Sequence, residues 1–465
     1  MRKKKELVDV EPVRLPKVLG MRPGKYLLIL YSFIIVLILF LILFLPGIVN
    51  GGRWVSFSSE MTEVGVIVDG SYVGSTSGSL YFIESGDHQI TYIKNGIEVG
   101  TQTLHVDHPV FATLFARRTQ EVTVDPVSTP ELYASVYSSA LSYLVSYSGV
   151  LEYDSGYNYR PVYQNYAKDA AAMGLSDVSD DFYTLSLFVT NRTMYDDLVK
   201  AEEILSSAGI SFRAADSEMT LAVIDGTAQK DSPAVSTEMT AQALSDGFFR
   251  YEGGTFTMGG NSSDPAALPV SVTVQPFEMS KSYVTEYDWA LFIEANPYWA
   301  KSNIAALIED GMADEYYLAG LNPSTAVHSS SPIRNISWYA ADAYCRWLSS
   351  ETGTDYSLPS EAQWYLASLS ASGRPYSRSL ISVGSDGSCP DSLMGGLWEF
   401  TSTAYVPLSR AEGLVIDASS LPESDIIVKG GSYINDPAAV TNETVGVMQR
   451  SVTSDYAGFR LVRSI

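Results

Sequence analysis

The side chains that most often perform catalysis or bind metals are scarce in this chain. Its 465 residues include two cysteines and four histidines. The histidines are His88, His105, His108 and His328. They form none of the HxxxH or HExxH pairs that place two imidazoles on one metal ion. We therefore do not expect a histidine-based catalytic metal centre.

One cysteine lies in the stretch ISWYAADAYCRWLSSETG, residues 336–353, which predicts a helix. Ser337 can cap its start and Gly353 can end it. The positions Ala341, Tyr344, Cys345 and Leu348 share one apolar face. Cys345 is therefore a nucleophile, half of a disulfide with Cys389, or a small buried residue. A bridge needs Cα atoms within about 7 Å of each other, which sequence spacing does not determine.

A membrane segment is the strongest signal in the sequence. Residues 26–45 read YLLILYSFIIVLILFLILFL and carry no charge. Twenty helical residues span about 30 Å, the thickness of the hydrocarbon core. A cleavable signal peptide has a shorter apolar region followed by small residues, whereas PGIVNGGRW follows here. We predict a cytoplasmic tail at 1–25 and an uncleaved signal anchor, a transmembrane helix, at 26–48.

The charge distribution predicts the orientation. Residues 1–25 carry eight Lys and Arg against three acids, a net charge of +5. The whole chain has a net charge of −23, so the residues after 25 carry −28. The positive-inside rule places residues 1–25 in the cytoplasm and the chain after about residue 50 outside it. The acidic remainder excludes nucleic acid as a partner, because phosphate binding needs clustered cations.

Residues 54–116 predict a small all-β domain. Short apolar runs alternate with the turn dipeptides Asp69-Gly70, Ser85-Gly86 and Asn95-Gly96. The segment VGVIVDGSYVGST, with ESGDHQITYIKNG after it, resembles a PEGA domain, a β-sandwich module of bacterial surface proteins. The usual proline before the strand is missing. The resemblance implies a spacer or a contact close to the cell wall.

Residues 117–245 predict a mixed α/β connector. The stretch after Pro130 and residues 193–209 read as helices. The alternating stretch at 183–189 and the apolar stretch at 219–226 read as strands. The polar residues before 246 read as a linker.

Residues 246–465 contain a series of motifs in order. They are YEGGTFTMGG, VTVQPFEMSKSYVTEYDWALFIEA, SPIRNISWYAADAYCRWLSSETG, SLPSEAQWYLAS, MGGLWEFTS, VKGGSY and AGFRLVR. The set resembles the formylglycine-generating enzyme family, also called the sulfatase-modifying factor family. The resemblance implies an irregular α+β domain related to C-type lectins. Trp289, Trp338, Trp347, Trp364 and Trp398 suit such a loop-rich fold as apolar anchors.

Active members of that family oxidise a sulfatase cysteine with copper bound by two cysteines of their own. Carried onto GGSYINDPAAV, these positions are Asn435 and Val440. An amide and an isopropyl group cannot replace two soft thiolate ligands. We therefore expect no catalytic residues, no copper and a pseudoenzyme.

Two further family features concern Cys345 and calcium. In some relatives the Cys345 position pairs with a cysteine of the closing GFRC motif, but Leu461 stands there. A buried apolar role for Cys345 is favoured, with a bridge to Cys389 as the alternative. The family's GNxWE segment contributes to a calcium site. Here it reads GGLWE, so Glu399 stays a candidate calcium ligand while the asparagine is lost.

The resemblance also implies a cleft after Gly430-Gly431. We predict that Trp398, Tyr433, Asn435 and Arg450 line it as a ligand groove for an envelope glycan or protein. The favoured function is a single-pass protein of a bacterial inner membrane with an extracytoplasmic binding or scaffold domain. The alternatives are an oxidoreductase using other residues, like the related iron-dependent sulfoxide synthases, and a purely structural envelope spacer.

Overall fold

The computed structural model describes residues 16–148, 159–230, 241–260, 264–371, 376–378, 380 and 388–465. The described residues form two compact units. One contains the chain up to Val136 together with Lys168–Gly174, and the other contains Tyr137–Ala167 and Leu175–Ile465. Most of the basic tail, including Lys3 to Lys5, and most of the predicted linker at 231–242 lie outside the described residues.

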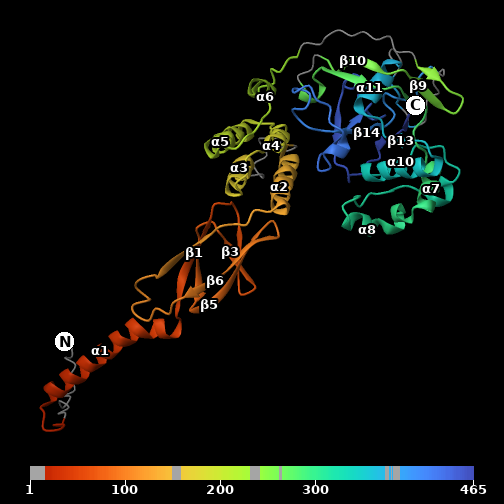
Figure 1. The fold of residues 1–465 in the computed structure, drawn as a ribbon. Coiled ribbons are helices and arrows are strands. Elements are labelled where there is room, and N and C mark those ends of the chain that lie inside the picture. The colour runs from red at the N-terminus through yellow and green to blue at the C-terminus, as the bar shows by residue number, and fades with distance from the viewer. Residues whose placement is uncertain are drawn as a thin grey trace, which may run out of the picture. The chain divides into compact units, whose positions relative to one another are not determined.

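Helix α1, Pro23–Val49, contains the whole predicted anchor (Figure 1). Pro23 is a suitable first residue of this helix because the proline ring fixes its φ at a helical value. Within the described part of the chain it is the one helix long and apolar enough to cross a membrane. Its leucine, isoleucine and phenylalanine side chains are exposed along most of its length. A helix apolar on all sides and not covered by protein is suited to a lipid environment.

The predicted β domain consists of two sheets, with orders β4-β1-β7 and β3-β2-β5-β6. The strands are β1 (Gly52–Ser59), β2 (Gly65–Val68), β3 (Ser71–Ser75), β4 (Leu80–Glu84), β5 (Gly86–Lys94), β6 (Ile97–Val106) and β7 (Thr119–Val124). Phe57 of β1 and Tyr92 of β5 are buried with ring centroids 6.1 Å apart, so the sheets share a core.

Two of the three predicted turns close hairpins. The residues of Asp69-Gly70 and Asn95-Gly96 all have positive φ, the conformation of tight hairpin turns. Ser85-Gly86 instead carries the chain from β4 in one sheet to β5 in the other. Strand β7 lies beyond residue 116 and pairs in parallel with β1.

The connector is helical where two strands were predicted. Its helices are α2 (Pro130–Ser148), α3 (Val162–Ala172), α4 (Ser179–Ser186), α5 (Arg192–Ala208) and α6 (Ser217–Ile224). The prediction of strands at 183–189 and 219–226 is wrong, because the first contains the end of α4 and the second lies largely in α6. In α4, Phe182 and Leu185 are buried three residues apart, a helical spacing that the alternation within 183–189 hides.

The C-terminal region combines short strands with five α-helices among its described residues. The helices are α7 (Glu286–Ala295), α8 (Ile304–Glu309), α9 (Pro323–Ala326), α10 (Trp338–Thr352) and α11 (Glu361–Leu369). Ser337 caps α10 by accepting from the Ala340 N–H, and Gly353 ends it in the left-handed conformation. Both boundaries agree with the sequence prediction.

The described strands of this region form three sheets, with orders β10-β11, β13-β18-β12-β9-β8 and β16-β15-β14-β17. The strands are β8 (Gln242–Ala243), β9 (Phe248–Tyr251), β10 (Gly254–Met258), β11 (Val270–Val274), β12 (Phe277–Ser280), β13 (Tyr356–Ser357), β14 (Trp398–Ala404), β15 (Ile426–Lys429), β16 (Gly446–Met448), β17 (Ala457–Gly458) and β18 (Val462–Ser464). Trp289 and Trp364 are fully buried in two separate core clusters.

Candidate functional site

The turn after β15 contains Asn435, the first of the two positions that the family resemblance assigns to copper. Gly430 and Gly431 have φ of +94° and +68°, so the chain reverses sharply where the strand ends. The Oδ1 atom of Asn435 accepts hydrogen bonds from the N–H of Ser432 at 2.8 Å and from its Oγ at 2.9 Å. The amide of Asn435 therefore closes the turn.

Val440, the second of these positions, fills apolar space. Its side chain is buried, and its Cγ1 lies 2.7 Å from where a Cβ on Gly431 would be. The hydroxyl of Tyr376 donates to the carbonyl of Ser432 at 2.8 Å beside it. An isopropyl group and a turn-closing amide offer no soft ligand, so the residues present do not fit copper.

The two cysteines do not supply a substitute pair. Both are buried and not joined by a disulfide. Cys345 belongs to the core cluster around Trp289, and burial raises the pKa of its thiol well above the ordinary value. A protonated, buried thiol is a poor nucleophile and a poor metal ligand. Of the three roles open for Cys345, the structure supports the small buried residue.

Glu399, the candidate calcium ligand, is fully buried on β14 and paired with Arg460. Nε of Arg460 donates to Oε2 at 2.5 Å and Nη2 donates to Oε1 at 2.7 Å. Burial disfavours the charged form of Arg460, but Glu399 and Tyr283 together outweigh burial and raise the pKa of Arg460. Because both carboxylate oxygens accept from the guanidinium, Glu399 is a structural acid and not a ligand ready for a hard cation.

A second buried charge cluster was not predicted from the sequence. Glu361, the first residue of α11, is fully buried, and its Oε1 lies 2.8 Å from Nη2 of Arg410 and 3.4 Å from Nζ of Lys429. Burial lowers the pKa of Lys429, while Glu361 opposes that shift. Lys429 directly precedes Gly430. The available signal was a charged residue inside each of the apolar motifs SEAQW and IIVKGG.

The four predicted groove residues do not lie together. Trp398 and Tyr433 both contact Tyr456. The backbone N–H of Trp398 donates to the Tyr456 carbonyl, and the ring centroids of Tyr433 and Tyr456 are 5.7 Å apart. Asn435 closes the neighbouring turn. Arg450 is buried elsewhere, with its guanidinium 4.7 Å from the ring of Trp338.

Arg450 holds a loop in place. Its Nε donates to the carbonyl of Ser424 at 2.8 Å, and its Nη2 donates to the carbonyls of Ala418 and Leu421, both at 2.8 Å. Three charge-assisted bonds to one segment make the arginine a brace for residues 418–424. The prediction of one groove containing all four residues is not supported by this arrangement.

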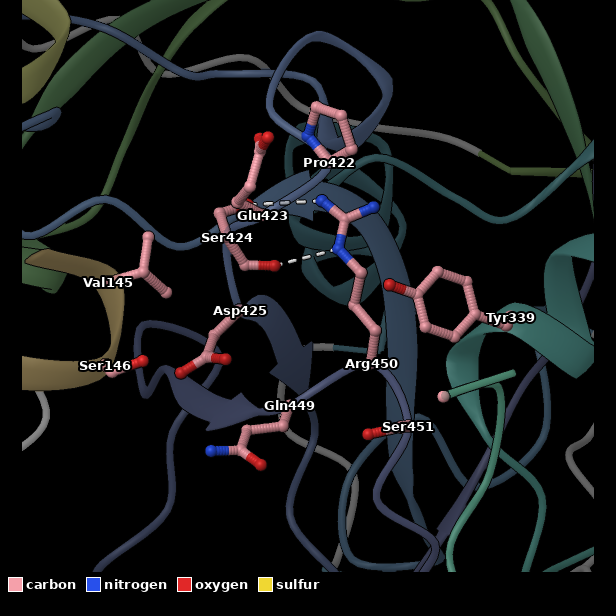
Figure 2. A pocket seen from close by; sticks show the side chains of 11 residues that line it. Val145, Ser146, Tyr339, Pro422, Glu423, Ser424, Asp425, Gln449, Arg450 and Ser451 are labelled. Atoms are coloured by element: carbon pink, nitrogen blue, oxygen red, sulfur yellow. Dashed lines mark hydrogen bonds between the residues drawn. The ribbon is translucent and has the colours of Figure 1, made fainter. Parts of the chain in front are cut away.

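A pocket of about 370 Å³ opens beside this brace (Figure 2). Its lining residues are Val145, Ser146, Gly311, Tyr339, Pro422, Glu423, Ser424, Asp425, Gln449, Arg450 and Ser451. Figure 2 shows the Tyr339 ring on one side and the acids Glu423 and Asp425 on the other. Burial raises the pKa of Asp425, and Arg450 opposes that shift. An aromatic face opposite carboxylates and hydroxyls is suited to a polyhydroxy or peptide ligand.

Comparison with known proteins identifies the C-terminal region. Residues 233–385 and 391–465 match the sulfatase-modifying factor enzyme 1-like domain, so this region belongs to that family. An uncharacterized protein of Borreliella burgdorferi is 21% identical over 401 residues, which cover 77% of this chain and 79% of that protein.

Several solved structures are similar to about half of the chain. PvdO from Pseudomonas aeruginosa is 16% identical, with 49% of this chain and 100% of PvdO covered and a TM-score of 0.35. Variable protein 1 of Treponema denticola is 14% identical, with 50% and 97% covered and a TM-score of 0.31. CarF is 16% identical, with 47% and 98% covered and a TM-score of 0.31.

Proposed function

We propose that this chain is a single-pass membrane protein of a bacterial envelope whose sulfatase-modifying factor domain binds a ligand or serves as a scaffold, without copper chemistry. Helix α1 is the anchor, and the chain after it is extracytoplasmic. The β domain is a PEGA-like spacer between the anchor and the binding domain.

The main support for the loss of copper chemistry is the structural role of Asn435 and Val440. Oxidation in this family needs two thiolates at these positions, which accept a soft metal ion. Here the Asn435 amide accepts from Ser432 and Val440 packs against Gly431. Both positions now stabilise the turn itself.

The pocket beside Tyr339 favours a binding role over a pure spacer. It is walled by a half-buried aromatic ring, a carboxylate on Asp425 and the braced 418–424 loop. Three bonds from Arg450 hold that loop. A preorganised wall reduces the entropy lost when a ligand binds. A spacer needs no such pocket.

A mass-spectrometric assay tests the loss of catalysis. The full chain in detergent is incubated with copper, oxygen and a cysteine peptide of the sulfatase type. The peptide mass should stay unchanged, while an active formylglycine-generating enzyme run in parallel converts the same peptide. Conversion by this chain to the aldehyde would refute the proposal.

Binding of peptidoglycan fragments tests the pocket. We expect the full chain to retain muropeptides, and Asp425→Asn combined with Tyr339→Ala to weaken retention at least tenfold, since each lost contact is worth about 1 kcal/mol or more. Glu294→Gln, an exposed change on α7 outside the pocket, should bind as wild type. If the wild-type chain retains neither muropeptides nor an envelope protein, the spacer function replaces the binding function.

A further inference from the structure

The segment between β6 and β7 exposes apolar side chains that a soluble domain would cover. Val110, Phe111, Leu114 and Phe115 are exposed to 37%, 52%, 65% and 70%. They lie within six consecutive residues of the sequence DHPVFATLFARR. A continuous apolar patch of this kind marks a contact with a partner or a membrane.

This segment runs alongside the end of the anchor helix. His108 packs against Gly51 and the Val110 carbonyl packs against Gly47, leaving no room for a Cβ at either glycine. The N–H of Ala112 then donates to the carbonyl of Leu43 at 2.7 Å.

The spacing of these contacts is that of an extended segment following a helix. Two extended residues, from 110 to 112, advance about 6.6 Å. One helical turn of four residues, from 47 back to 43, advances about 6 Å. The segment therefore runs along α1 toward the N-terminal end of the helix, and two residues of the segment advance about as far as one helical turn.

The contact reaches the apolar part of the anchor. The rings of Phe44 and Phe111 have centroids 5.3 Å apart. Phe44 is the penultimate residue of the uncharged run 26–45, whose length of about 30 Å equals the hydrocarbon thickness. For an α1 that spans the bilayer over this run, Phe111 is placed where the hydrocarbon core meets the headgroups.

The backbone of Ala112 is fully hydrogen-bonded at the turn of the segment. The Ala112 N–H is satisfied by Leu43, and the Ala112 carbonyl accepts from the N–H groups of Phe115 and Ala116 at 3.0 and 3.1 Å. Both backbone polar groups of Ala112 are therefore paired, which lowers the cost of placing this residue near lipid.

Cations follow the apolar tip. Arg117 and Arg118 are exposed, and the guanidinium of Arg117 lies 5.2 Å from the ring centre of Trp54. Tryptophan is enriched at the headgroup level of a bilayer, and long arginine side chains extend to that level. Lipid phosphates complement the two exposed positive charges.

We propose that residues 109–115 insert into the outer leaflet beside α1, with Arg117 and Arg118 at the level of the lipid phosphates. The β domain is thereby fixed to the membrane surface at two points, the anchor and this loop, instead of hanging from a single helix. The occupant of the apolar patch is lipid. The proposal rests on α1 crossing the membrane.

Depth-dependent quenching in vesicles tests the insertion. The full chain carrying Phe115→Cys is labelled with an environment-sensitive nitrobenzoxadiazole dye and reconstituted into phosphatidylethanolamine–phosphatidylglycerol vesicles. The label should emit at shorter wavelength than in water and be quenched by acyl-chain spin-labelled lipid. The buried Cys345 and Cys389 should give little background, which the wild-type chain measures.

Glu98→Cys provides the matched control. Glu98 is exposed on β6 beyond the Asn95-Gly96 turn. Strand β5 begins at Gly86, whose neighbour Ser85 donates to Gly51, and ends at Lys94, about 26 Å farther along the strand. A label at 98 should therefore stay aqueous and unquenched.

The outcomes separate the loop from the anchor. Quenching at 115 but not at 98 supports insertion. No quenching at 115 in a chain that resists carbonate extraction overturns the loop proposal and leaves the anchor intact. Carbonate extraction of the chain overturns the anchor and the loop together. Equal quenching at both positions shows that the whole β domain lies on the bilayer and overturns insertion by this segment.

Discussion

Single residues explain why the C-terminal domain keeps its fold without the family's metal ligands. The buried carboxylates Glu361 and Glu399 face cations of the same chain, Arg410 with Lys429 and Arg460 respectively. Buried charges are tolerated when they are paired and hydrogen-bonded. These groups hold loops and strands together and are not poised for a substrate.

Replacing Glu399 should destabilise the protein strongly. Glu399→Gln leaves the buried Arg460 guanidinium without its counter-charge, and breaking a buried pair from one side costs about 3 to 5 kcal/mol. Chemical denaturation of the full chain in detergent measures the loss. The control Asp196→Asn removes an exposed pair with Arg192 and should cost about 0.5 kcal/mol or less.

Two results would contradict a structural role for Glu399. A Glu399→Gln variant as stable as wild type contradicts the structural role. Stabilisation of the wild type by Ca²⁺ that this variant lacks would show that the carboxylate serves a metal ion.

Cys345 should resist thiol reagents until the domain unfolds. Burial raises the pKa of its thiol, so the thiolate does not form near pH 8.5 as in an exposed cysteine. Labelling with iodoacetamide should therefore show no increase between pH 7 and pH 9 in the native chain, and should be rapid in denaturant. Rapid native labelling of Cys345, located by peptide mapping, contradicts its burial.

The same thiol makes stability depend on pH. Below the unfolded pKa of about 8.5 the thiol is protonated in both the folded and the unfolded chain, so its contribution to the free energy of unfolding is fully present there. Above that pH the unfolded thiol loses its proton while the folded one keeps it, so stability falls by up to about 1.4 kcal/mol per pH unit. Comparing wild type with Cys345→Ala between pH 8 and pH 10 isolates this slope. Equal slopes in the two proteins argue against a raised pKa.

At the scale of elements, local signals decided which predictions succeeded. The boundaries of α10 were predictable because Ser337 and Gly353 act on their own backbone neighbours. The strands predicted at 183–189 and 219–226 were wrong because short apolar runs fit helix and strand alike. The pairing of Arg450 with the 418–424 loop depends on tertiary contacts that no local pattern encodes.

The turn after β15 should be sensitive to added volume. Gly431→Ala introduces a Cβ 2.6 Å from the Tyr376 hydroxyl and 2.7 Å from Val440, at a φ of +68°. We expect a cost of about 1 to 2 kcal/mol from the left-handed conformation and about 1 to 3 kcal/mol more from overpacking. Denaturant unfolding measures it.

Gly353→Ala is the matched control for this turn. Its φ is +70°, but a Cβ there meets open space. It should therefore carry only the conformational cost. Equal losses in the two variants would mean that Val440 and Tyr376 do not close tightly on Gly431.

For the whole molecule, composition predicted the long apolar helix α1 and the order of motifs predicted the C-terminal family, since both signals extend over many residues. The site itself was less accessible. The candidate residues Trp398, Tyr433 and Asn435 lie near one another, but Arg450 belongs to a pocket whose walls come from distant segments, including Ser146 and Tyr339. Pockets formed by segments far apart in sequence are defined only by the folded chain.

Topology gives a prediction that concerns the whole chain. Eight basic residues precede the apolar run, whereas Arg53 is the nearest basic residue after it, so residues 1–25 should stay in the cytoplasm and residues 50–465 should be extracytoplasmic. Protease added to intact spheroplasts should digest the C-terminal domain while a cytoplasmic marker survives. Exchanging the sign of the tail by changing Lys3, Lys4, Lys5 and Arg14 to Glu should reduce the digested fraction, because cytoplasmic cations set the orientation. A C-terminal domain protected in the wild type alongside the marker places it in the cytoplasm, which removes both the envelope ligand and the outer-leaflet loop.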